Sequence, residues 1–300
     1  MSLLQTSPLL LALLLPALGA LLPWLTGRFR PLRDGLNLLL PAGLLVVILS
    51  ILPTALAGET LTFTIGDFGS GLSFALALTP LGMIYALVAS SLWILNTIYS
   101  YGYMRGLYGN DFPGQERYWC CFALAILSAM GIALSANMLT LFLFYELMTF
   151  STWPLVTHSR KPEAKRSGRI YLGILVGSST LFMLTAIVLT WIWTGTLDFR
   201  DGGILAGSTT AGQAAVLILL FFFGTGKTAI FPLHQWLPNA MVAPTPVSAL
   251  LHAATMVAAG VYLVVRGFPL FSASGQVLMI MCYIGAFTNC GQLGHTYTRF

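Results

Sequence analysis

Apolar runs of membrane-spanning length fill most of the sequence, and short polar segments separate them. A helix needs about 20 consecutive apolar residues to cross the hydrocarbon core of a bilayer, which is roughly 30 Å thick. This pattern predicts an all-α polytopic membrane protein with about nine transmembrane helices. We expect these helices near residues 9–25, 36–56, 80–99, 118–136, 137–157, 170–193, 214–243, 245–266 and 276–288.

One loop departs from this pattern, because its apolar residues alternate with polar ones. The alternation covers residues 61–65 and 72–76, and Gly66, Asp67 and Gly69 lie between the two stretches. A period of two around glycine-rich turn residues is typical of a β-hairpin. We therefore expect one β-hairpin in an exposed loop between the second and third helices.

The expected seventh helix, residues 214–243, is interrupted by polar and proline residues. Proline lacks a backbone N–H, so Pro232 cannot donate to the carbonyl of Thr228, four residues earlier. The helix should therefore break just after Lys227 and leave unpaired carbonyl groups beside the Lys227 ammonium. Pro238 is the second residue that we expect to contribute to the break. Transporters build ion sites from broken helices of this kind.

The overall composition excludes a soluble domain and a nucleic-acid-binding protein. Hydrophobic residues make up 57% of the chain and charged residues only 8%, and the mean hydropathy is +0.85. The formal net charge is +5, but the positive residues do not form one basic run. They lie between apolar segments, as in a membrane protein.

The distribution of these positive residues predicts the orientation of the chain. By the positive-inside rule, loops rich in Lys and Arg face the cytoplasm. The loops after the second, fourth, sixth and eighth helices contain only Arg200 and Arg266. The amino terminus and the hairpin should therefore face outward. The loops after the first, third and fifth helices contain Arg28, Arg30, Arg33, Arg105, Arg117, Arg160, Lys161, Lys165, Arg166 and Arg169.

The first apolar run is interpreted as a retained helix. It has no basic segment before it, and the basic residues follow it instead. A cleaved signal peptide has the opposite charge order.

Two ionisable residues stand inside the apolar helices. A charged side chain at the bilayer centre costs about 3 kcal/mol on insertion scales, so it is rarely kept without a partner or a function. Glu146 lies about 14 Å along its helix from Asn137, near the midplane. The alternative is a structural carboxyl group that is hydrogen-bonded to a neighbour such as Thr149. For Lys227, the alternative is a long side chain that reaches the membrane interface.

The segment around Lys227 also has a superficial similarity to a phosphate-binding loop. The sequence GTGKT contains the required glycine, lysine and hydroxyl residue, but Phe221 occupies the position of the first glycine. No strand pattern precedes it. We therefore expect no nucleotide site.

A polar stripe marks the helix after the break. Thr245 is expected to cap this helix, with Pro246 in its first turn. Ser248, His252 and Thr255 follow at spacings of four and three, so they share one face of a regular helix. A histidine side chain ordinarily titrates near neutral pH, although for His252 a core histidine bonded to a hydroxyl is the alternative. His234, within the break, is a weaker candidate.

No metal or cofactor is expected. His234 and His252 lie on opposite sides of the proline-rich break and have no second histidine on their own helices, which argues against haem. The four cysteines form no CxxC pair and have no metal-ligand spacing. Dinucleotide, serine-triad and zinc signatures are absent from the sequence.

Two stretches resemble the antiporter-like subunits shared by Mrp cation/proton antiporters, respiratory complex I and membrane-bound hydrogenases. The first is GKTAIFPLHQWLPNAMVAPTPVSALLHAATMVAAGVYLVVR, and the second combines IYSYGYMRG with ALSANMLTLFLFYELMTFSTWPLVTH. Together they cover residues 98–266. The segment ELMTFSTWPLVTH is closer to the D type of Mrp antiporter than to complex I, and the A type is also consistent.

This resemblance implies roles for the candidate residues. Lys227 would be the proton-carrying lysine that exchanges charge with Glu146, and His252 would relay protons between half-channels. The helix break lies at Pro232 and Pro238. Candidate channel-lining residues are His234, Thr149, Thr228, Ser248 and Thr255.

The resemblance also implies a division of the chain into three regions. Residues 1–117 would form an N-terminal three-helix region with the outward-facing hairpin. Residues 118–268 would form the first proton-channel bundle, with its broken helix at 214–243. Residues 269–300 would begin a second bundle that is incomplete here, because the sequence does not follow the family's usual continuation.

The implied function is proton translocation, without covalent chemistry, in a multi-subunit complex of the bacterial inner membrane. Na⁺ or K⁺ would be the exchanged cation in an Mrp-type antiporter, and the sequence does not identify it. One alternative is a proton-pumping subunit of an NADH-quinone oxidoreductase or hydrogenase, driven by redox partners. The other is a non-conducting scaffold. In each case the partners are other membrane subunits and the lipid bilayer.

Overall fold

The computed structural model describes residues 3–26, 29–69, 71–109, 112–199, 203–205, 209–271 and 275–297. Most of these residues are helical, and a two-stranded sheet accompanies them. The helices are α1 (Leu3–Leu25), α2 (Arg30–Leu56), α3 (Pro80–Tyr108), α4 (Gln115–Ala133), α5 (Met138–Val156), α6 (Pro162–Ser178), α7 (Thr185–Thr194), α8 (Ala211–Gly224), α9 (Trp236–Ala240), α10 (Thr245–Ala249), α11 (Met256–Arg266), α12 (Phe268–Phe271) and α13 (Gly275–Tyr297).

Four short turns of other helix types connect some of these elements. Two are 3-10 turns and two are π-helical turns, which close i→i+5 hydrogen bonds and occur frequently at functional sites. The 3-10 turns are η2 (Gly226–Thr228) and η3 (Leu233–Gln235), and the π-helical turns are η1 (Ser179–Leu184) and η4 (Leu250–Ala254).

Seven helices of the described chain are long and apolar enough to cross a membrane. Two of the seven are composite, because α6, η1 and α7 form one continuous span of 33 residues and α10, η4 and α11 form another of 22 residues. The expected helices at 214–243 and 276–288 correspond to shorter apolar segments, Ala211–Gly224 and Val277–Asn289. The chain is therefore a multi-pass, mostly helical membrane protein.

Several helix ends differ from those expected. Helix α3 continues to Tyr108 and α6 begins at Pro162, so basic residues expected in loops lie within helical turns. The apolar pattern identifies only the part of a helix inside the hydrocarbon, whereas the helix itself continues into the polar region. Thr245 is the first residue of α10 and not its cap, and its hydroxyl bonds to Tyr103 at 3.2 Å.

The expected hairpin is present and is fixed to the helices. Strands β1 (Thr62–Gly69) and β2 (Leu72–Ala77) pair in antiparallel fashion. Strand β2 docks on the link between α4 and α5, where the Ala77 N–H donates to the Leu134 carbonyl at 2.7 Å. Asn137 caps α5 by accepting from Thr140 N–H at 2.8 Å, and its amide also donates to the Ser73 carbonyl at 2.8 Å. One side chain therefore joins the hairpin to the start of α5.

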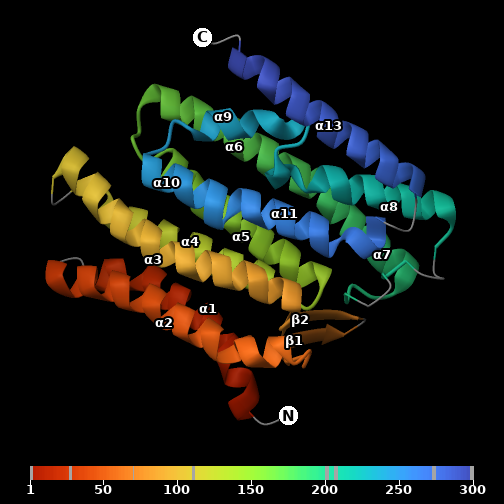
Figure 1. The fold of residues 1–300 in the computed structure, drawn as a ribbon, viewed down its shortest axis with the longest axis horizontal. Helices are drawn as coiled ribbons and strands as arrows, with labels where there is room; N and C mark the ends of the chain where they lie inside the picture. The colour runs from red at the N-terminus through yellow and green to blue at the C-terminus, as the bar shows by residue number, and fades with distance from the viewer. Residues whose placement is uncertain are drawn as a thin grey trace.

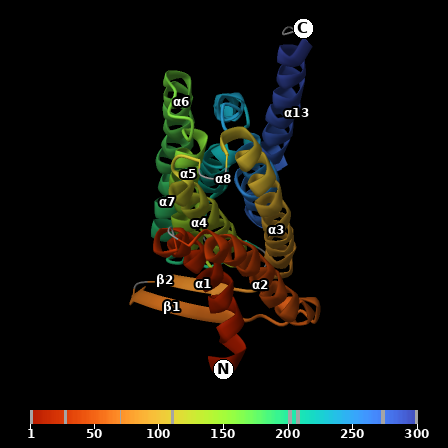
Figure 2. The same cartoon turned by 90° about the vertical axis from the view of Figure 1, so that its left-hand side faces the viewer.

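The long helices pack side by side between two distinct ends (Figure 1). Helices α1 and α2 pack against α3 and α4, and α13 lies near α8 on the other side. Figure 2 shows the hairpin at one end and the start of α6 at the other. Arg105, in the last turn of α3, forms an ion pair with Asp34 at the end remote from the hairpin.

Glycines allow the closest helix contacts near the hairpin end. A Cβ atom on Gly82 would lie 2.1 Å from the Ala133 carbonyl oxygen. One on Gly131 would lie 2.2 Å from the ring of Phe144. Only glycine permits both contacts, which set the spacing of α3, α4 and α5, the last of which carries Glu146.

Candidate functional site

The broken helix surrounds Lys227, but the break begins earlier than expected. Helix α8 starts with a capping box at Thr210 and ends at Gly224, before Lys227 and not after it. Lys227 lies in turn η2, inside the break, and its side chain is 0% exposed. Ala229 follows at a φ of 55°, a left-handed conformation that does not continue a helix. The break therefore extends on both sides of Lys227.

The ammonium group of Lys227 is held by α5. Its Nζ donates a hydrogen bond of 2.6 Å to the Thr149 hydroxyl. The same Nζ lies 3.3 Å from the centroid of the Tyr145 ring, which is a cation–π contact. The sequence predicts Thr149 as a channel-lining residue or as a neighbour of Glu146, and the structure makes it a direct partner of the lysine.

Tyr145 also stabilises the backbone of the break. Its hydroxyl donates to the Gly224 carbonyl at 3.3 Å and accepts from the Lys227 N–H at 3.3 Å. Trp236 donates from its indole nitrogen to the Gly226 carbonyl at 2.8 Å. Two of the carbonyl groups exposed by the break, those of Gly224 and Gly226, are therefore paired. Neither aromatic residue gave a signal in the sequence, because their roles depend on tertiary contact.

Glu146 follows Tyr145 on α5 and is therefore one residue away from a direct contact of Lys227. The Glu146 and Lys227 side chains nevertheless share neither an ion pair nor a hydrogen bond. Glu146 Oε1 is buried and has no hydrogen-bond partner. An unsatisfied buried polar atom costs about 1–3 kcal/mol. The carboxylate and the ammonium are therefore near neighbours that do not neutralise each other by direct contact.

Glycines let the neighbouring helices approach the broken segment. A Cβ atom on Gly260 of α11 would lie 2.7 Å from the Thr228 backbone nitrogen. One on Gly224 would lie 2.8 Å from the backbone nitrogen of Met183, in η1. Backbone atoms cannot move aside as a flexible side chain can. The break is therefore enclosed by α5, η1 and α11.

His252 lies in the π-helical turn η4 and takes no part in the Lys227 contacts described above. The Thr255 N–H bonds to the Leu250 carbonyl five residues earlier, at 3.0 Å. The prediction of a shared face for Ser248, His252 and Thr255 assumed a regular α-helix. The π-helical turn changes the rotation between these residues, so that prediction used the wrong helix type. Thr255 is buried and its hydroxyl donates to the Leu250 carbonyl. His252 Nε2 is buried and without a partner.

The remaining candidates surround the break without contacting the ammonium. His234 stacks on Phe231 at 5.8 Å, and its Nδ1 is buried without a partner. The Thr228 hydroxyl donates to a backbone carbonyl within the break. Pro232 lies in the break as expected. Pro238 instead lies inside the short helix α9.

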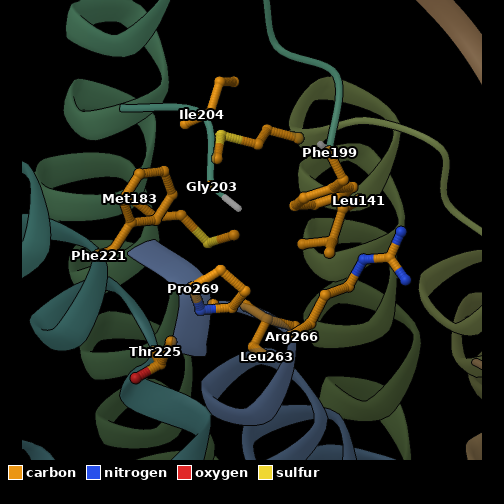
Figure 3. A pocket seen from close by; sticks show the side chains of 12 residues that line it. Leu141, Met183, Phe199, Gly203, Ile204, Phe221, Thr225, Leu263, Arg266 and Pro269 are labelled. Carbon is orange, nitrogen blue, oxygen red and sulfur yellow. The ribbon is translucent and has the colours of Figure 1, made fainter. Parts of the chain in front are cut away.

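An apolar cavity of about 80 Å³ lies beside the end of α8 (Figure 3). Arg266 is its one charged residue, and in Figure 3 the guanidinium group points away from the cavity. That group donates to Thr79, Tyr262 and the Ser135 carbonyl. The cavity offers no proton carrier. Its lining is Met138, Leu141, Met183, Phe199, Gly203, Ile204, Phe221, Thr225, Leu263, Arg266, Gly267 and Pro269.

Within the described residues, no cluster of three His, Cys, Asp or Glu side chains could hold a metal ion. The free cysteines among them are Cys120, Cys121 and Cys282.

This geometry defines the class of the protein: it is a multi-pass membrane protein with a buried lysine in a broken helix. The chain belongs to the family described as "NADH:quinone oxidoreductase/Mrp antiporter, TM", which matches residues 135–290. The match contains α5, the break, η4 and α11, and therefore every candidate residue.

Two relatives illustrate this similarity, one a chain of an oxidoreductase and the other a subunit of an antiporter. The chain is 36% identical over 217 residues to NAD(P)H-quinone oxidoreductase chain 5 of Synechocystis sp., covering 69% of this chain and 31% of that protein. It is 32% identical over 285 residues to Na(+)/H(+) antiporter subunit A1 of Staphylococcus aureus, and this match covers 93% of this chain and 35% of that protein. The chain thus spans about a third of the length of these relatives.

Solved structures have the same fold. The Mrp complex from Dietzia sp. DQ12-45-1b superposes with a TM-score of 0.76 at 28% identity, covering 93% of this chain and 29% of that one. The membrane-bound sulfane sulfur reductase, an archaeal respiratory membrane complex, gives a TM-score of 0.74 at 22% identity. This superposition covers 90% of this chain and 42% of that one. The second likeness concerns the fold alone.

Replacing Gly260 with alanine should destabilise the protein. The new Cβ atom would meet the backbone of the break, and overpacking of this kind costs about 1–3 kcal/mol. Gly173→Ala is the matched control, because a Cβ atom there has no neighbour within 4 Å. The control should be neutral or more stable, since alanine favours helix by about 1 kcal/mol. Thermal unfolding in detergent measures both, and equal midpoints would contradict the enclosed break.

Glu146 and Lys227 should be energetically coupled. If their charges interact, Glu146→Gln and Lys227→Met should together cost less than the sum of the single changes, by about 0.5–3 kcal/mol. The measurement is a double-mutant cycle of unfolding free energies. Glu163→Gln paired with Lys227→Met is the control and should be additive, because Glu163 is an exposed residue in the first turn of α6. Additivity of the first pair would show that the two groups do not communicate at rest.

Proposed function

We propose that this chain forms the proton-translocating bundle of a subunit of a monovalent cation/proton antiporter of the Mrp type. The observation that carries the proposal is the buried Lys227 ammonium, bonded to the Thr149 hydroxyl and not to a carboxylate. A neutral hydroxyl stabilises an ammonium without fixing its charge as an ion pair does. The lysine can therefore give up and regain a proton.

Glu146, Lys227 and His252 are the proposed carriers. Support comes from buried polar atoms that lack a protein partner, on Glu146, His234 and His252. Buried polar groups are usually satisfied by protein or by ordered water. Water reaching these atoms would extend a proton path from α5 through the break to η4. Thr149, Thr228, Ser248 and Thr255 are the candidate channel-lining hydroxyls.

The proposed topology has nine crossings and an outward-facing amino terminus. In this arrangement α8 with the break and α9 forms the seventh crossing, and α13 contributes the ninth. The hairpin would lie in the periplasm of a bacterial inner membrane. Arg105 and Arg117 lie at the helix ends remote from the hairpin, in agreement with the positive-inside rule.

A redox-driven pump is the second candidate function. The similarity to NAD(P)H-quinone oxidoreductase chain 5 favours it, and the proton path would be the same. In both cases the partners would be other membrane subunits. Co-purifying flavin and iron–sulfur subunits would identify the redox complex, whereas their absence together with cation-dependent proton flux would identify the antiporter. The relatives named above include subunit A1, which favours the A type over the D type.

Lys227→Met should abolish proton translocation while leaving assembly intact, because methionine is apolar and of similar length. Lys227→Arg should not restore it, since a guanidinium does not release its proton in a protein. We expect a loss on the order of 100-fold, the usual contribution of a positioned proton carrier. The measurement is pH-dependent dye quenching in vesicles containing the assembled complex.

The exposed Lys161→Met is the control for this experiment and should retain full flux. Wild-type flux in Lys227→Arg would show that only a charge is required. Wild-type flux in Lys227→Met and in Glu146→Gln would indicate a scaffold.

Labelling of single cysteines tests the orientation. Cysteines introduced at Lys165 and Asp67, in a chain lacking the native four, should react with an impermeant maleimide from opposite sides of the membrane. Both native residues are exposed, so neither substitution disturbs the core. Reaction from the same side would contradict the proposed topology.

A further inference from the structure

A hollow of about 580 Å³ lies at the membrane end remote from the hairpin. Its walls come from the first turn of α4, the last turns of α5, the following turn and the first turns of α6. This is the end where α3 finishes and α6 begins in Figure 1. The lining residues are Arg117, Trp153, Thr157, Arg160, Lys165 and Arg169.

This hollow is distinguished by positive charge that no described residue neutralises through an ion pair. None of its four cationic side chains makes an ion pair or a hydrogen bond with any described residue, and no acidic residue lines it. Arg117 Nε is buried and has no partner. By contrast, Arg105 pairs with Asp34, and Arg266 makes three hydrogen bonds. Arg105 and Arg266 thus have partners among the described residues, whereas this cluster has none.

The neighbouring histidine, His158, adds no charge to the hollow. His158 lies behind it, packed on Phe112 and Tyr118. Burial, together with the nearby charges of Arg117 and Arg160, lowers the pKa of His158 to about 4, so the imidazole is neutral near pH 7. Arg160 is held at a φ of 54°, which is uncommon for a residue other than glycine. Such conformations persist where the surrounding structure fixes them.

The floor of the hollow is formed by α5. Gly168 of α6 allows close approach, because a Cβ atom there would lie 2.3 Å from Thr157 and 3.1 Å from the Trp153 indole nitrogen. Trp153 is 38% exposed. Tryptophan is enriched at the membrane–water interface, where its ring meets both lipid and headgroup.

Below Trp153, the exposed surface of α5 is apolar. Phe150 and Leu143 are exposed on this helix and lie seven residues apart, so they share a face. An occupant whose polar group fills the hollow can therefore extend an apolar portion along α5. Neither free phosphate nor an acidic peptide has this combination.

We propose that the hollow binds the phosphate headgroup of an anionic glycerophospholipid. Arg117, Lys165 and Arg169 would contact the phosphate oxygens, and one acyl chain would lie along α5. Guanidinium groups bind phosphate through paired hydrogen bonds. Basic pockets between transmembrane helices recognise anionic headgroups on the cytoplasmic side. The hollow itself contains none of the proposed carriers, and the proposal stands whether or not the chain moves protons.

The test uses the assembled complex in nanodiscs and spin-labelled phosphatidylglycerol as the probe. The wild type should immobilise the labelled lipid, and phosphatidylcholine should bind at least tenfold more weakly. Arg117→Gln combined with Arg169→Gln should lower the affinity for phosphatidylglycerol about tenfold. Arg105→Gln is the control for position, because it removes one positive group at the same membrane end but outside the hollow, and it should retain the wild-type affinity.

Several outcomes would overturn the proposal. These are equal immobilisation of phosphatidylglycerol and phosphatidylcholine by the wild type, equal loss in the control, or no loss in the double variant. Inorganic phosphate that displaces the labelled lipid as effectively as unlabelled phosphatidylglycerol would reveal a soluble-anion site. A wild-type complex that binds no labelled lipid would leave the hollow to a partner subunit. If the double variant fails to assemble, Lys165→Gln on the exposed face of α6 replaces it, with an expected reduction of about threefold.

Discussion

The rest of the site depends on how the buried Lys227 ammonium is kept in the interior of the protein. An ammonium has three N–H donors, and the structure supplies one hydroxyl, from Thr149, and the face of Tyr145. This is enough to retain the group but not to fix its charge. Direct contact with Glu146 would neutralise both groups and hold the proton on the lysine, so the missing ion pair is as informative as the bonds that form.

A second constraint follows from the membrane, because backbone groups in hydrocarbon must be satisfied by protein or water. The break that places Lys227 exposes carbonyl groups that a continuous helix would bond. Tyr145 and Trp236 donate to two of them, and the glycines at 224 and 260 let η1 and α11 close around the segment. The site is therefore a rigid, enclosed break and not a flexible loop. Its polarity is concentrated on one face of α5.

The sequence predicted the helices, the hairpin and the broken segment, because these follow from local apolar runs, alternation and proline. It also located Lys227 and Glu146, since charge inside an apolar run is visible without a structure. It could not locate the first residue of the break, because α8 ends at Gly224, where the backbone approaches Met183 closely, and no local pattern marks that tertiary contact. The hydrogen bonds from Tyr145 to the break and the π-helical turn that contains His252 could not be predicted either, since both depend on the position of one helix against another.

Helix α5 connects the two polar regions of the molecule. Tyr145, Glu146 and Thr149 lie in its middle, and Trp153, one turn beyond Thr149, forms part of the floor of the cationic hollow. Pro154 follows immediately and removes one backbone hydrogen bond from the last turn. A change at Trp153 would therefore disturb the lysine site through the shared helix. Arg117 and Arg169 belong to α4 and α6, so their removal changes the charge of the hollow while the partners of Lys227 keep their positions.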